Sequence, residues 1–216
     1  KNILWEKFVV RSNQKNNDMK PVLLSTAYLP PIHYFSVLLK NESVFIEKQE
    51  HFIKQTYRNR CEILSSNGKL SLTIPLQKNA DKELISDKKI SYAETWQIKH
   101  WRAITSAYKN SAYFEFFEDD FKLFYFEKHE LILDYNTELT KLILKILRQK
   151  KEIHFTSEYS KEFNGIDLRE NQKPETINQK YYQVFGDKFG FTPNLSVIDL
   201  LFNKGLESVD YLTLKV

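Results

Sequence analysis

The segment 19–48 constrains the fold more than any other part of the chain, because it predicts two parallel strands joined by a helix. An apolar run at 21–27 is typical of a buried strand. It must end at the Pro30-Pro31 pair, since proline cannot donate a hydrogen bond to a sheet. The pattern over 32–40 favours a helix that starts directly after the prolines, and 43–48 indicates a second strand. This order of strand, helix and strand implies parallel pairing in an α/β fold.

A β-hairpin is expected at about 58–75, where two runs of alternating polar and apolar residues flank the Asn67-Gly68 pair. An Asn-Gly pair in this position is the strongest local signal for a hairpin. Side chains alternate along a strand, so Arg58 and Arg60 are expected on the face opposite Cys61.

The second half of the chain has the three- and four-residue apolar spacing that is typical of helices. Helices are expected at 95–109, 113–126, 132–146 and 195–203, the last ending at Gly205. A strand is expected at 152–156, a loop at 165–175 and a further helix at 176–185. We interpret Asn136 or Thr137 as a cap of the third helix. Because neither a repeat nor a linker is found, the sequence predicts a single α/β domain with a largely helical second half.

Residues 1–18 are interpreted as an N-terminal extension that need not be native, and 19–216 as the single domain. Met19 is the only methionine and precedes the first expected strand. The alternative is a fragment of a longer chain, with a strand at 3–10.

The chain has the features expected of a cytoplasmic protein. No apolar stretch near Lys1 resembles a signal peptide, and no run approaches the roughly 18 apolar residues of a membrane span. The single cysteine, Cys61, excludes an internal disulfide and suits a reducing compartment.

The net charge of +4 does not indicate a nucleic-acid partner. Half of this charge belongs to residues 1–18, and the basic and acidic residues of the remaining chain nearly balance. Binding to nucleic acid is typical of a concentrated basic face. Any recognition of an anion is therefore expected to be local.

The standard motifs of several kinds of site are missing. The chain has neither a GxGxxG nor a GxxxxGK(S/T) phosphate loop, and it has no GxSxG elbow. Its five histidines do not show metal-ligand spacing, and Cys61 lies within an expected strand. We therefore expect neither a metal nor a cofactor.

Two places near the expected strand ends hold residues that could move a proton or bind an anion. His33 lies in the first turn after the prolines, and ligands of open α/β sheets bind outside the carboxyl ends of the strands. Arg58 and Arg60 are two of only six arginines, and a guanidinium can bind carboxylate or phosphate through two hydrogen bonds. Asn59 adds further donors. The plainer alternatives are that His33 only packs or caps at the start of the helix, and that Arg58 and Arg60 face solvent from a strand.

A third candidate lies on the helix expected at 95–109. His100 shares a face of this helix with Trp96, one turn earlier, and Tyr108 follows two turns later. These groups could line a cleft through stacking and hydrogen bonds. The commoner situation for a histidine on an apolar face is that of a satisfied core residue.

The chain resembles the WbqC-like family in an ordered set of segments between residue 22 and about 212. The segments are AYLPPIHYF at 27–35, YRNR at 57–60, LTIPL at 72–76, WQIKH at 96–100, AYKNSAYF at 107–114, YYQVF at 181–185 and PNLSVIDLLFN at 193–203. Their order and spacing carry the resemblance, since each segment is short.

This resemblance implies a bacterial protein of surface-polysaccharide or lipopolysaccharide biosynthesis, in a family whose name-giving member is described as a glycine transferase. We therefore expect an acyl transferase, glycyl in its most specific form, that acts on a small sugar or nucleotide-sugar ligand. His33 or His100 would be the general base that deprotonates an amine. The expected substrate-binding residues are Tyr28, Arg58, Asn59, Arg60, Trp96 and Tyr108.

Two other functions stay open. A non-catalytic sugar- or nucleotide-binding accessory protein would use the same aromatic residues without converting its ligand. Nucleotidyl transfer is suggested by the order of strand, proline turn, histidine and helix. The HxGH-type pair of such enzymes is absent, because Tyr34 and Phe35 follow His33.

Overall fold

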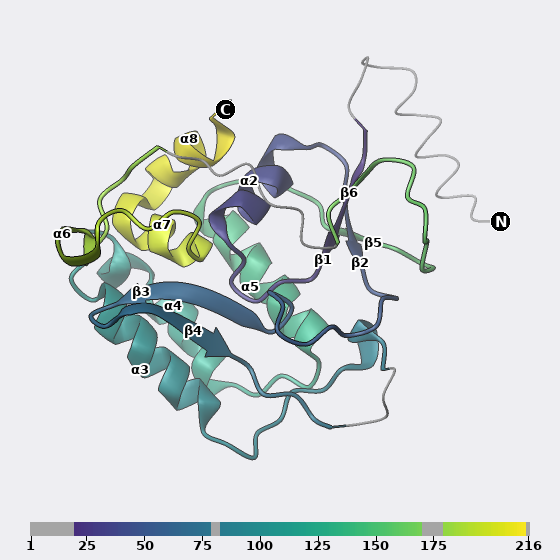
Figure 1. Ribbon diagram of the computed structural model, residues 1–216, viewed down its shortest axis with the longest axis horizontal. Helices are drawn as coiled ribbons and strands as arrows, with labels where there is room; N and C mark the ends of the chain where they lie inside the picture. The colour runs from purple at the N-terminus through teal and green to yellow at the C-terminus, as the bar shows by residue number, and fades with distance from the viewer. Residues whose placement is uncertain (1–19, 79–82, 170–178, 215–216) are drawn as a thin grey trace.

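The computed structural model describes residues 20–78, 83–169 and 179–214, and Figure 1 shows how its elements are arranged. Four short parallel strands form one sheet in the order β5-β2-β1-β6. They are β1 (Val22–Ser25), β2 (Val44–Glu47), β5 (His154–Phe155) and β6 (Ile166–Asp167). This sheet, a separate hairpin and a largely helical second half confirm the predicted α/β class.

The opening unit of strand, helix and strand is confirmed. β1 and β2 pair in parallel, with Ser25 beside Glu47 at their last register position. The helix α2 (Ile32–Lys40) connects them and begins directly after the proline pair. β5 falls within the strand expected at 152–156. Because all four strands run in the same direction, their carboxyl ends meet at one edge of the sheet.

The fourth strand, β6, corrects the expectation of a loop at 165–175. It pairs with β1, and the flanking hydrogen bonds run from Ile166 N to Pro21 O at 2.9 Å and from Leu168 N to Leu23 O at 2.8 Å. Two residues are too few to show an alternating pattern, and the partner strand lies far earlier in the chain. No local signal therefore marks this strand, and the later part of the expected loop lies outside the described residues.

The predicted hairpin is present as β3 (Arg60–Ser65) and β4 (Gly68–Thr73). Gly68 follows the turn with a φ of +97°, a conformation that glycine adopts without steric cost. The first strand begins at Arg60 and not at Arg58, so the expected alternation does not extend to Arg58. Arg58 is buried, whereas Arg60 is half-buried.

The helices follow the expected spacing in most of the second half. They are α3 (Trp96–Tyr108), α4 (Phe114–Phe126), α5 (Ile132–Ile146), α6 (Gly186–Phe189), α7 (Val197–Lys204) and α8 (Ser208–Thr213), with the 3-10 turns η1 (Ile85–Asp87) and η2 (Gly205–Glu207). Gly205 ends α7 with a φ of +57°, as expected of a glycine that stops a helix.

The helix expected at 176–185 is wrong where the structure describes it. Residues 176–178 lie outside the described part, and 179–185 are not helical. The side chain of Gln183 donates to Thr192 O at 2.9 Å and accepts from Thr192 N at 2.8 Å. This pairing across nine residues holds the segment in a loop.

The predicted cap of α5 is also wrong. The helix begins at Ile132, directly after Leu131, so Asn136 and Thr137 lie inside it. Asn136 Nδ2 donates to the backbone carbonyl of Arg58 at 2.8 Å, which ties α5 to the segment before β3. The polar side chain that looked like a cap is a link between two elements.

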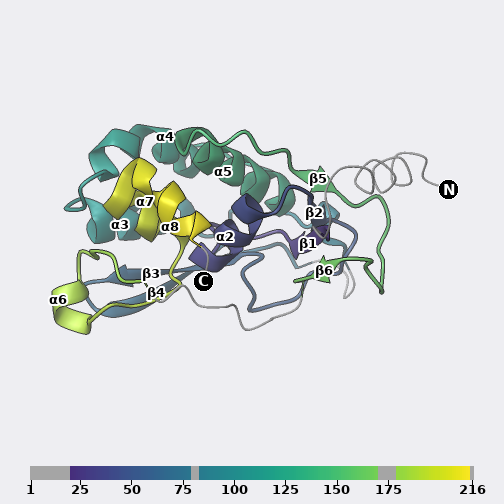
Figure 2. The same ribbon diagram turned by 90° about the horizontal axis from the view of Figure 1, so that it is seen from above.

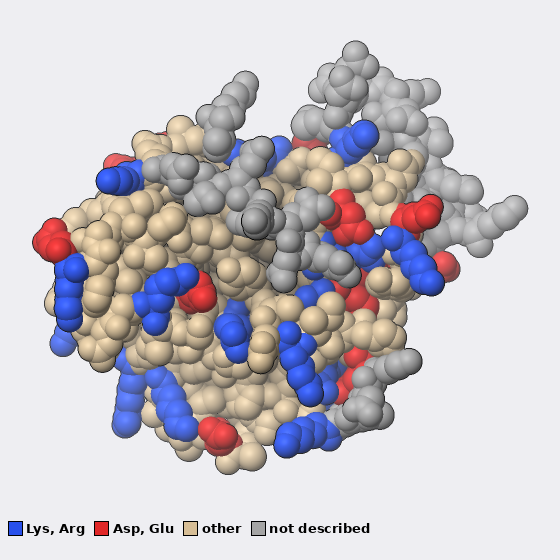
Figure 3. Space-filling view, viewed as in Figure 1, with Lys and Arg blue, Asp and Glu red and all other residues tan. Residues whose placement is uncertain are grey.

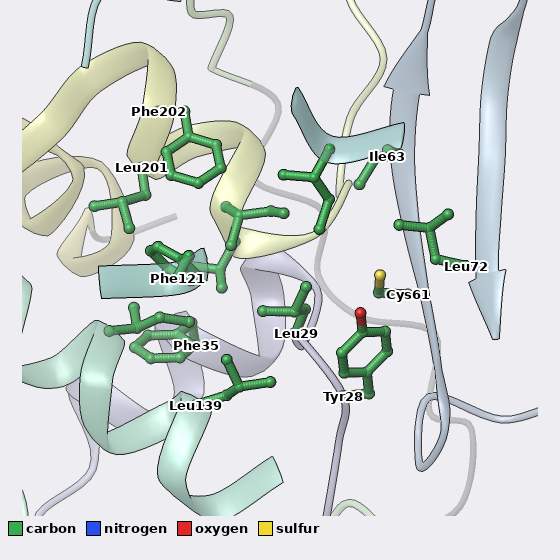
Figure 4. Packing of buried hydrophobic residues seen from close by; sticks show 14 of the residues in the cluster. Tyr28, Leu29, Phe35, Cys61, Ile63, Leu72, Phe121, Leu139, Leu201 and Phe202 are labelled. Carbon is green, nitrogen blue, oxygen red and sulfur yellow. The ribbon is translucent and has the colours of Figure 1, made fainter. Parts of the chain in front are cut away.

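The main hydrophobic core lies between the hairpin and the helices. Figure 2 shows β3 and β4 on one side, α4 and α5 on the other, and α3, α7 and α8 between them. In the close view of Figure 4, Phe121, Leu139 and Leu201 come from three different helices and face Cys61 and Leu72 of the hairpin across the core. A smaller apolar cluster packs the parallel sheet against α5.

Candidate functional site

Charged and hydroxyl side chains gather where the four parallel strands end. Ser25, Glu47 and Asp167 are the last residues of β1, β2 and β6, and Thr156 directly follows β5. We define the edge cluster as Ser25, Glu47, Glu50, Arg58, Thr156, Asp167 and Arg169. Ligands of open α/β sheets bind outside the carboxyl ends of the strands. The edge cluster therefore lies where a functional site is expected.

Arg58 is held by Glu50 in a buried, bidentate ion pair. Its Nε donates to Glu50 Oε1 at 2.8 Å, and its Nη2 donates to Oε2 at 2.6 Å. Nη2 also donates to Ser25 Oγ at 2.8 Å, and Nη1 donates to Thr56 Oγ1 at 3.2 Å. The two charged side chains are only 4% and 6% exposed. The guanidinium that was predicted to bind an anion thus has a carboxylate partner within the chain.

Arg169 holds the other two carboxylates of the edge cluster. Its Nε lies 3.0 Å from both oxygens of Asp167, and its Nη1 donates to Glu47 Oε2 at 3.2 Å. Glu47 is fully buried, and its Oε1 accepts a hydrogen bond from Thr156 Oγ1. Burial alone would raise the pKa of Asp167, but the hydrogen bonds and charge of Arg169 hold it below its ordinary value.

The two halves of the edge cluster meet at the backbone carbonyl of Arg169. This oxygen accepts from Ser25 Oγ at 3.2 Å and from Arg58 Nη2 at 3.5 Å. Three carboxylates are set against two guanidiniums, so the cluster has one negative charge in excess when all five groups are ionised. The excess favours a cationic group, such as an amine, over a second anion. The exposed ring of Tyr159 lies 5.0 Å from the Arg169 guanidinium, at the border of the cluster.

Asn59 and Arg60 are bound to the hairpin. Asn59 Nδ2 donates to Ile74 O at 2.8 Å, and its Oδ1 is buried without a hydrogen-bond partner among the described residues. Arg60 Nε donates to Thr73 Oγ1, on the facing strand, at 3.2 Å. Their contact with a substrate stays a prediction.

His33 lies in the first turn of α2, where it is held by Asn194. Asn194 Oδ1 accepts from the backbone N of His33 at 3.0 Å and lies 2.8 Å from its Nδ1. Burial lowers the pKa of His33, and the hydrogen bond to Asn194 opposes this effect. The next residue, Tyr34, donates to the backbone carbonyl of Ser25 at 2.9 Å. The same turn of α2 therefore reaches the edge cluster through Tyr34.

His100 lies in the main core, together with the predicted residues Tyr28 and Trp96. Its Nδ1 is 3.1 Å from Tyr28 Oη, which in turn is 2.8 Å from Tyr125 Oη. Trp96 packs edge-on against the imidazole, with the ring centroids 5.1 Å apart. Figure 4 shows Tyr28 among apolar side chains, close to Cys61. Burial lowers the pKa of His100 to about 4, so this ring is neutral at neutral pH.

Tyr108 is also a core residue, and its hydroxyl donates to Asp199 Oδ1 at 3.0 Å. Asp199, in the first turn of α7, also accepts from Tyr181 and from Gln183 Nε2, the latter at 3.0 Å. Burial raises the pKa of Asp199 to about 6, although these three hydrogen bonds work in the opposite direction. The carboxylate has three donors around it and no ion-pair partner among the described residues.

The structure thus divides the predicted residues among separate places. Tyr28, Trp96 and His100 are together in the core, whereas Arg58 lies in the edge cluster and His33 pairs with Asn194. Sequence reasoning did not identify the other charged residues of the edge cluster or Asp199. One signal was available, since Arg169 is one of only six arginines and Glu47 lies at the end of an expected strand.

The face of the molecule drawn in Figure 3 agrees with the expectation of local rather than extended charge. In Figure 3 the basic and acidic side chains intermingle, and the visible face carries no continuous basic area. Within the ranges that the structure describes, no group of three His, Cys, Asp or Glu residues could hold a metal ion. No helix in those ranges has the length and apolar character needed to cross a membrane.

Comparisons with known proteins give a family and a distant relative. The family model of the WbqC-like protein family matches residues 26–171, which include every predicted site residue. A protein of Mycobacterium tuberculosis, described as the uncharacterized protein Rv1507c, is 25% identical over 228 residues, covering 89% of this chain and 97% of that protein. No solved structure matches this chain.

Proposed function

The chain belongs to the WbqC-like protein family, and on that premise we propose that it is a transferase of surface-polysaccharide or lipopolysaccharide biosynthesis. In its most specific form the proposed reaction passes a glycyl group from an activated aminoacyl ester to the amine of an amino sugar. The ligand would bind at the edge cluster. The family resemblance supports the class of reaction, and the geometry of the cluster supports the amine.

The observation that carries the proposal is the buried charge at the carboxyl edge of the sheet. Burying an ion pair costs several kcal/mol of desolvation per ion, which the attraction between the partners often fails to exceed. Such a pair is therefore weak evidence for a purely stabilising role. A cluster with one carboxylate in excess, at the edge where α/β sheets bind ligands, is better explained by recognition of a small cationic or polyhydroxyl molecule.

Asp167 is the carboxylate of the cluster that an incoming amine reaches most easily. Its side chain is 34% exposed, whereas that of Glu47 is fully buried. The ring of Tyr159 beside Arg169 offers an apolar face on which a sugar can stack. The proposed site thus combines a charge for the amine with a surface for the sugar ring.

His33 is the better of the two candidate bases. His100 is buried in the core and bonded to Tyr28, whereas His33 is half-buried in the turn of α2 that contacts the edge cluster through Tyr34. In the proposed step the amine nitrogen bonds to the acyl carbon, and the bond from that carbon to the leaving ester oxygen breaks. The proton of the amine passes to the His33 imidazole and then to the leaving oxygen.

The binding part of the proposal is tested with glucosamine as the probe, against glucose and N-acetylglucosamine, which lack a free amine. Ligand-observed NMR should show that glucosamine binds more tightly. The substitution Asp167→Asn should weaken the binding of glucosamine about tenfold, which corresponds to about 1.4 kcal/mol of lost charge attraction. The control Asp187→Asn, on the exposed surface of α6, should leave the binding of glucosamine unchanged. Equal binding of the three sugars, or equal effects of the two substitutions, would show that the amine is not recognised here.

The catalytic part is tested by incubating the chain with a glycyl ester and glucosamine and detecting the glycyl amide by mass spectrometry. The substitution His33→Gln should slow product formation about a hundredfold or more, as the loss of a general base does. His129→Gln serves as the control, since His129 lies between α4 and α5, where its ring stacks on Phe124. The same rate in both variants would remove His33 from the proposed mechanism.

A second candidate is a sugar-binding accessory protein without catalytic activity. The specific observation in its favour is that each charged side chain of the edge cluster already has an ion-pair partner within the cluster, while Tyr159 stays 53% exposed, which suits stacking without chemistry. Tight binding of sugars with no conversion by the unmodified chain would favour this candidate over the transferase.

A further inference from the structure

We infer that Asn194 is a positioning residue that holds the imidazole of His33 in its Nδ1–H form and leaves Nε2 as a proton acceptor. The use of that acceptor in acyl transfer rests on the proposed function. The tautomer of the ring does not rest on the proposed function, because it follows from hydrogen bonding alone.

The direction of the two hydrogen bonds decides the form of the ring. Asn194 Oδ1 lies 3.0 Å from the backbone N of His33 and 2.8 Å from Nδ1. A backbone N–H can only donate, so the Asn194 atom that meets it must be the amide oxygen and not the nitrogen. An amide oxygen can only accept, so Nδ1 carries a hydrogen. In the neutral ring the lone pair then belongs to Nε2.

The ring is in the state that a base needs. Burial lowers the pKa of His33, and although the Asn194 bond opposes this, the net direction favours the neutral imidazole. Nε2 makes no hydrogen bond with the described residues, and it is not among their fully buried atoms that lack a partner. No group of the described residues therefore occupies the lone pair, which a molecule at the first turn of α2 could use.

The two residues that follow Asn194 anchor its loop to the segment at the start of α2. Ile32 N donates to Leu195 O at 2.9 Å, and Ser196 Oγ donates to Leu29 O at 2.8 Å. Asn194 itself has a φ of +56°, in the left-handed region that asparagine tolerates better than most residues. The amide oxygen thus reaches His33 from a loop that is anchored to the start of α2, which is the arrangement expected of an orienting group.

The first test is heteronuclear NMR of the imidazole nitrogens in the full chain. In the unsubstituted protein, Nδ1 of His33 should be protonated and Nε2 should have the shift of an unprotonated nitrogen. The substitution Asn194→Gly removes the side chain and tolerates the backbone conformation, so it should let Nε2 become protonated. Asn41→Gly, at the other end of α2, is the control for a general disturbance of the helix and should leave the ring unchanged.

The second test is the conservative variant Asn194→Asp. It keeps an oxygen acceptor for both hydrogen bonds and adds a negative charge beside the ring, so Nδ1 should stay protonated while the pKa of His33 rises by about one to two pH units. A merely structural role of Asn194 would move the unfolding midpoint without this coupled change in the ring. A protonated Nε2 in the unsubstituted chain, or an unchanged ring in Asn194→Gly, would overturn the inference.

In the glycyl-transfer assay, Asn194→Gly should lower kcat about tenfold with little change in KM, as expected for a misoriented base. Asn194→Asp should restore much of the rate. The pH at which its activity rises should be higher than in the unsubstituted chain. If the unsubstituted chain transfers no glycyl group although the NMR result holds, the proposed function fails and the assignment of the ring stands.

Discussion

At the scale of single residues, the buried ion pair of Arg58 and Glu50 has a large expected energetic consequence. Arg58 and Glu50 are almost fully enclosed and are joined by two hydrogen bonds, of 2.6 Å and 2.8 Å. Removal of one partner leaves the other charge buried and unpaired, which is far more costly than removal of both.

The first prediction compares the two arginines that the sequence places close together. Arg58→Ala should lower the free energy of unfolding by about 3–5 kcal/mol, because Glu50 then stays buried without an opposite charge beside it. Arg60→Ala should change it by no more than about 0.5 kcal/mol, since this side chain makes one partly exposed hydrogen bond. Urea denaturation measures both. Similar losses of unfolding free energy in the two variants would contradict the prediction that only Arg58 has a buried carboxylate partner.

Asp199 provides the second prediction, on pH. Its pKa is raised from 3.8 to about 6 by burial, so the folded chain binds a proton that the unfolded chain releases. This contribution to stability is fully present below pH 3.8 and is lost as the pH rises to about 6. Relative to Asp199→Asn, the unsubstituted chain should lose on the order of 3 kcal/mol between pH 4 and 7.

Urea denaturation at the two pH values measures this difference, and the exposed Asp210 supplies the control. The difference between the unsubstituted chain and Asp210→Asn should not depend on pH. If the stability difference between the unsubstituted chain and Asp199→Asn is equally independent of pH, the Asp199 carboxyl group does not titrate in the predicted pH range.

At the scale of elements, the hairpin depends on one backbone conformation. Gly68 has a φ of +97°, and a Cβ built there would meet only Phe189, at 3.9 Å. There is room for a methyl group, so the cost of a side chain at this position comes from the backbone alone.

The third prediction is that Gly68→Ala lowers the free energy of unfolding by about 1 kcal/mol or more, because alanine disfavours positive φ. The matched control is Gly186→Ala at the start of α6, where the nearest atom to a new Cβ is at 3.7 Å and φ is not positive. It should be neutral or slightly stabilising. The reverse order of the two urea midpoints would show that the turn is not strained.

Elements with a long apolar period were predictable, and the shortest ones were not. α2, α3 and α5 show several turns of apolar spacing, and that local pattern predicts them well. β6 has two residues, and the loop around Gln183 is held by Thr192, nine residues later. Such elements depend on partners elsewhere in the chain, which a local pattern does not reveal.

At the scale of the whole molecule, stability is unevenly distributed. The main core joins the hairpin to α3, α4, α5 and α7, whereas the parallel sheet packs through a smaller apolar cluster. β6 lies at the edge of that sheet and its Ile166 is 43% exposed. Regions with few buried contacts open locally without global unfolding.

The fourth prediction concerns amide hydrogen exchange. The amides of Ile166 and Leu168 should exchange about tenfold or more faster than those of the central strand β1, because β6 opens locally. Saturating glucosamine should slow the exchange of β6 if the ligand binds at the edge cluster. Equal protection of β1 and β6 would contradict the local opening, and insensitivity to the sugar would argue against the binding site.

The sequence by itself determined the α/β class, the parallel opening unit, the hairpin and most helices, because each is encoded by local periodicity, turn residues or prolines. Only the tertiary structure decided which polar groups meet. Ser25 and Arg169 are hydrogen-bonded across 144 positions, and His33 and Asn194 across 161. Side-chain partners at such separations depend on how the strands and loops pack. The sequence therefore indicated His33 and Arg58 as candidates but not Asn194 and Glu50, the residues that decide what each can do.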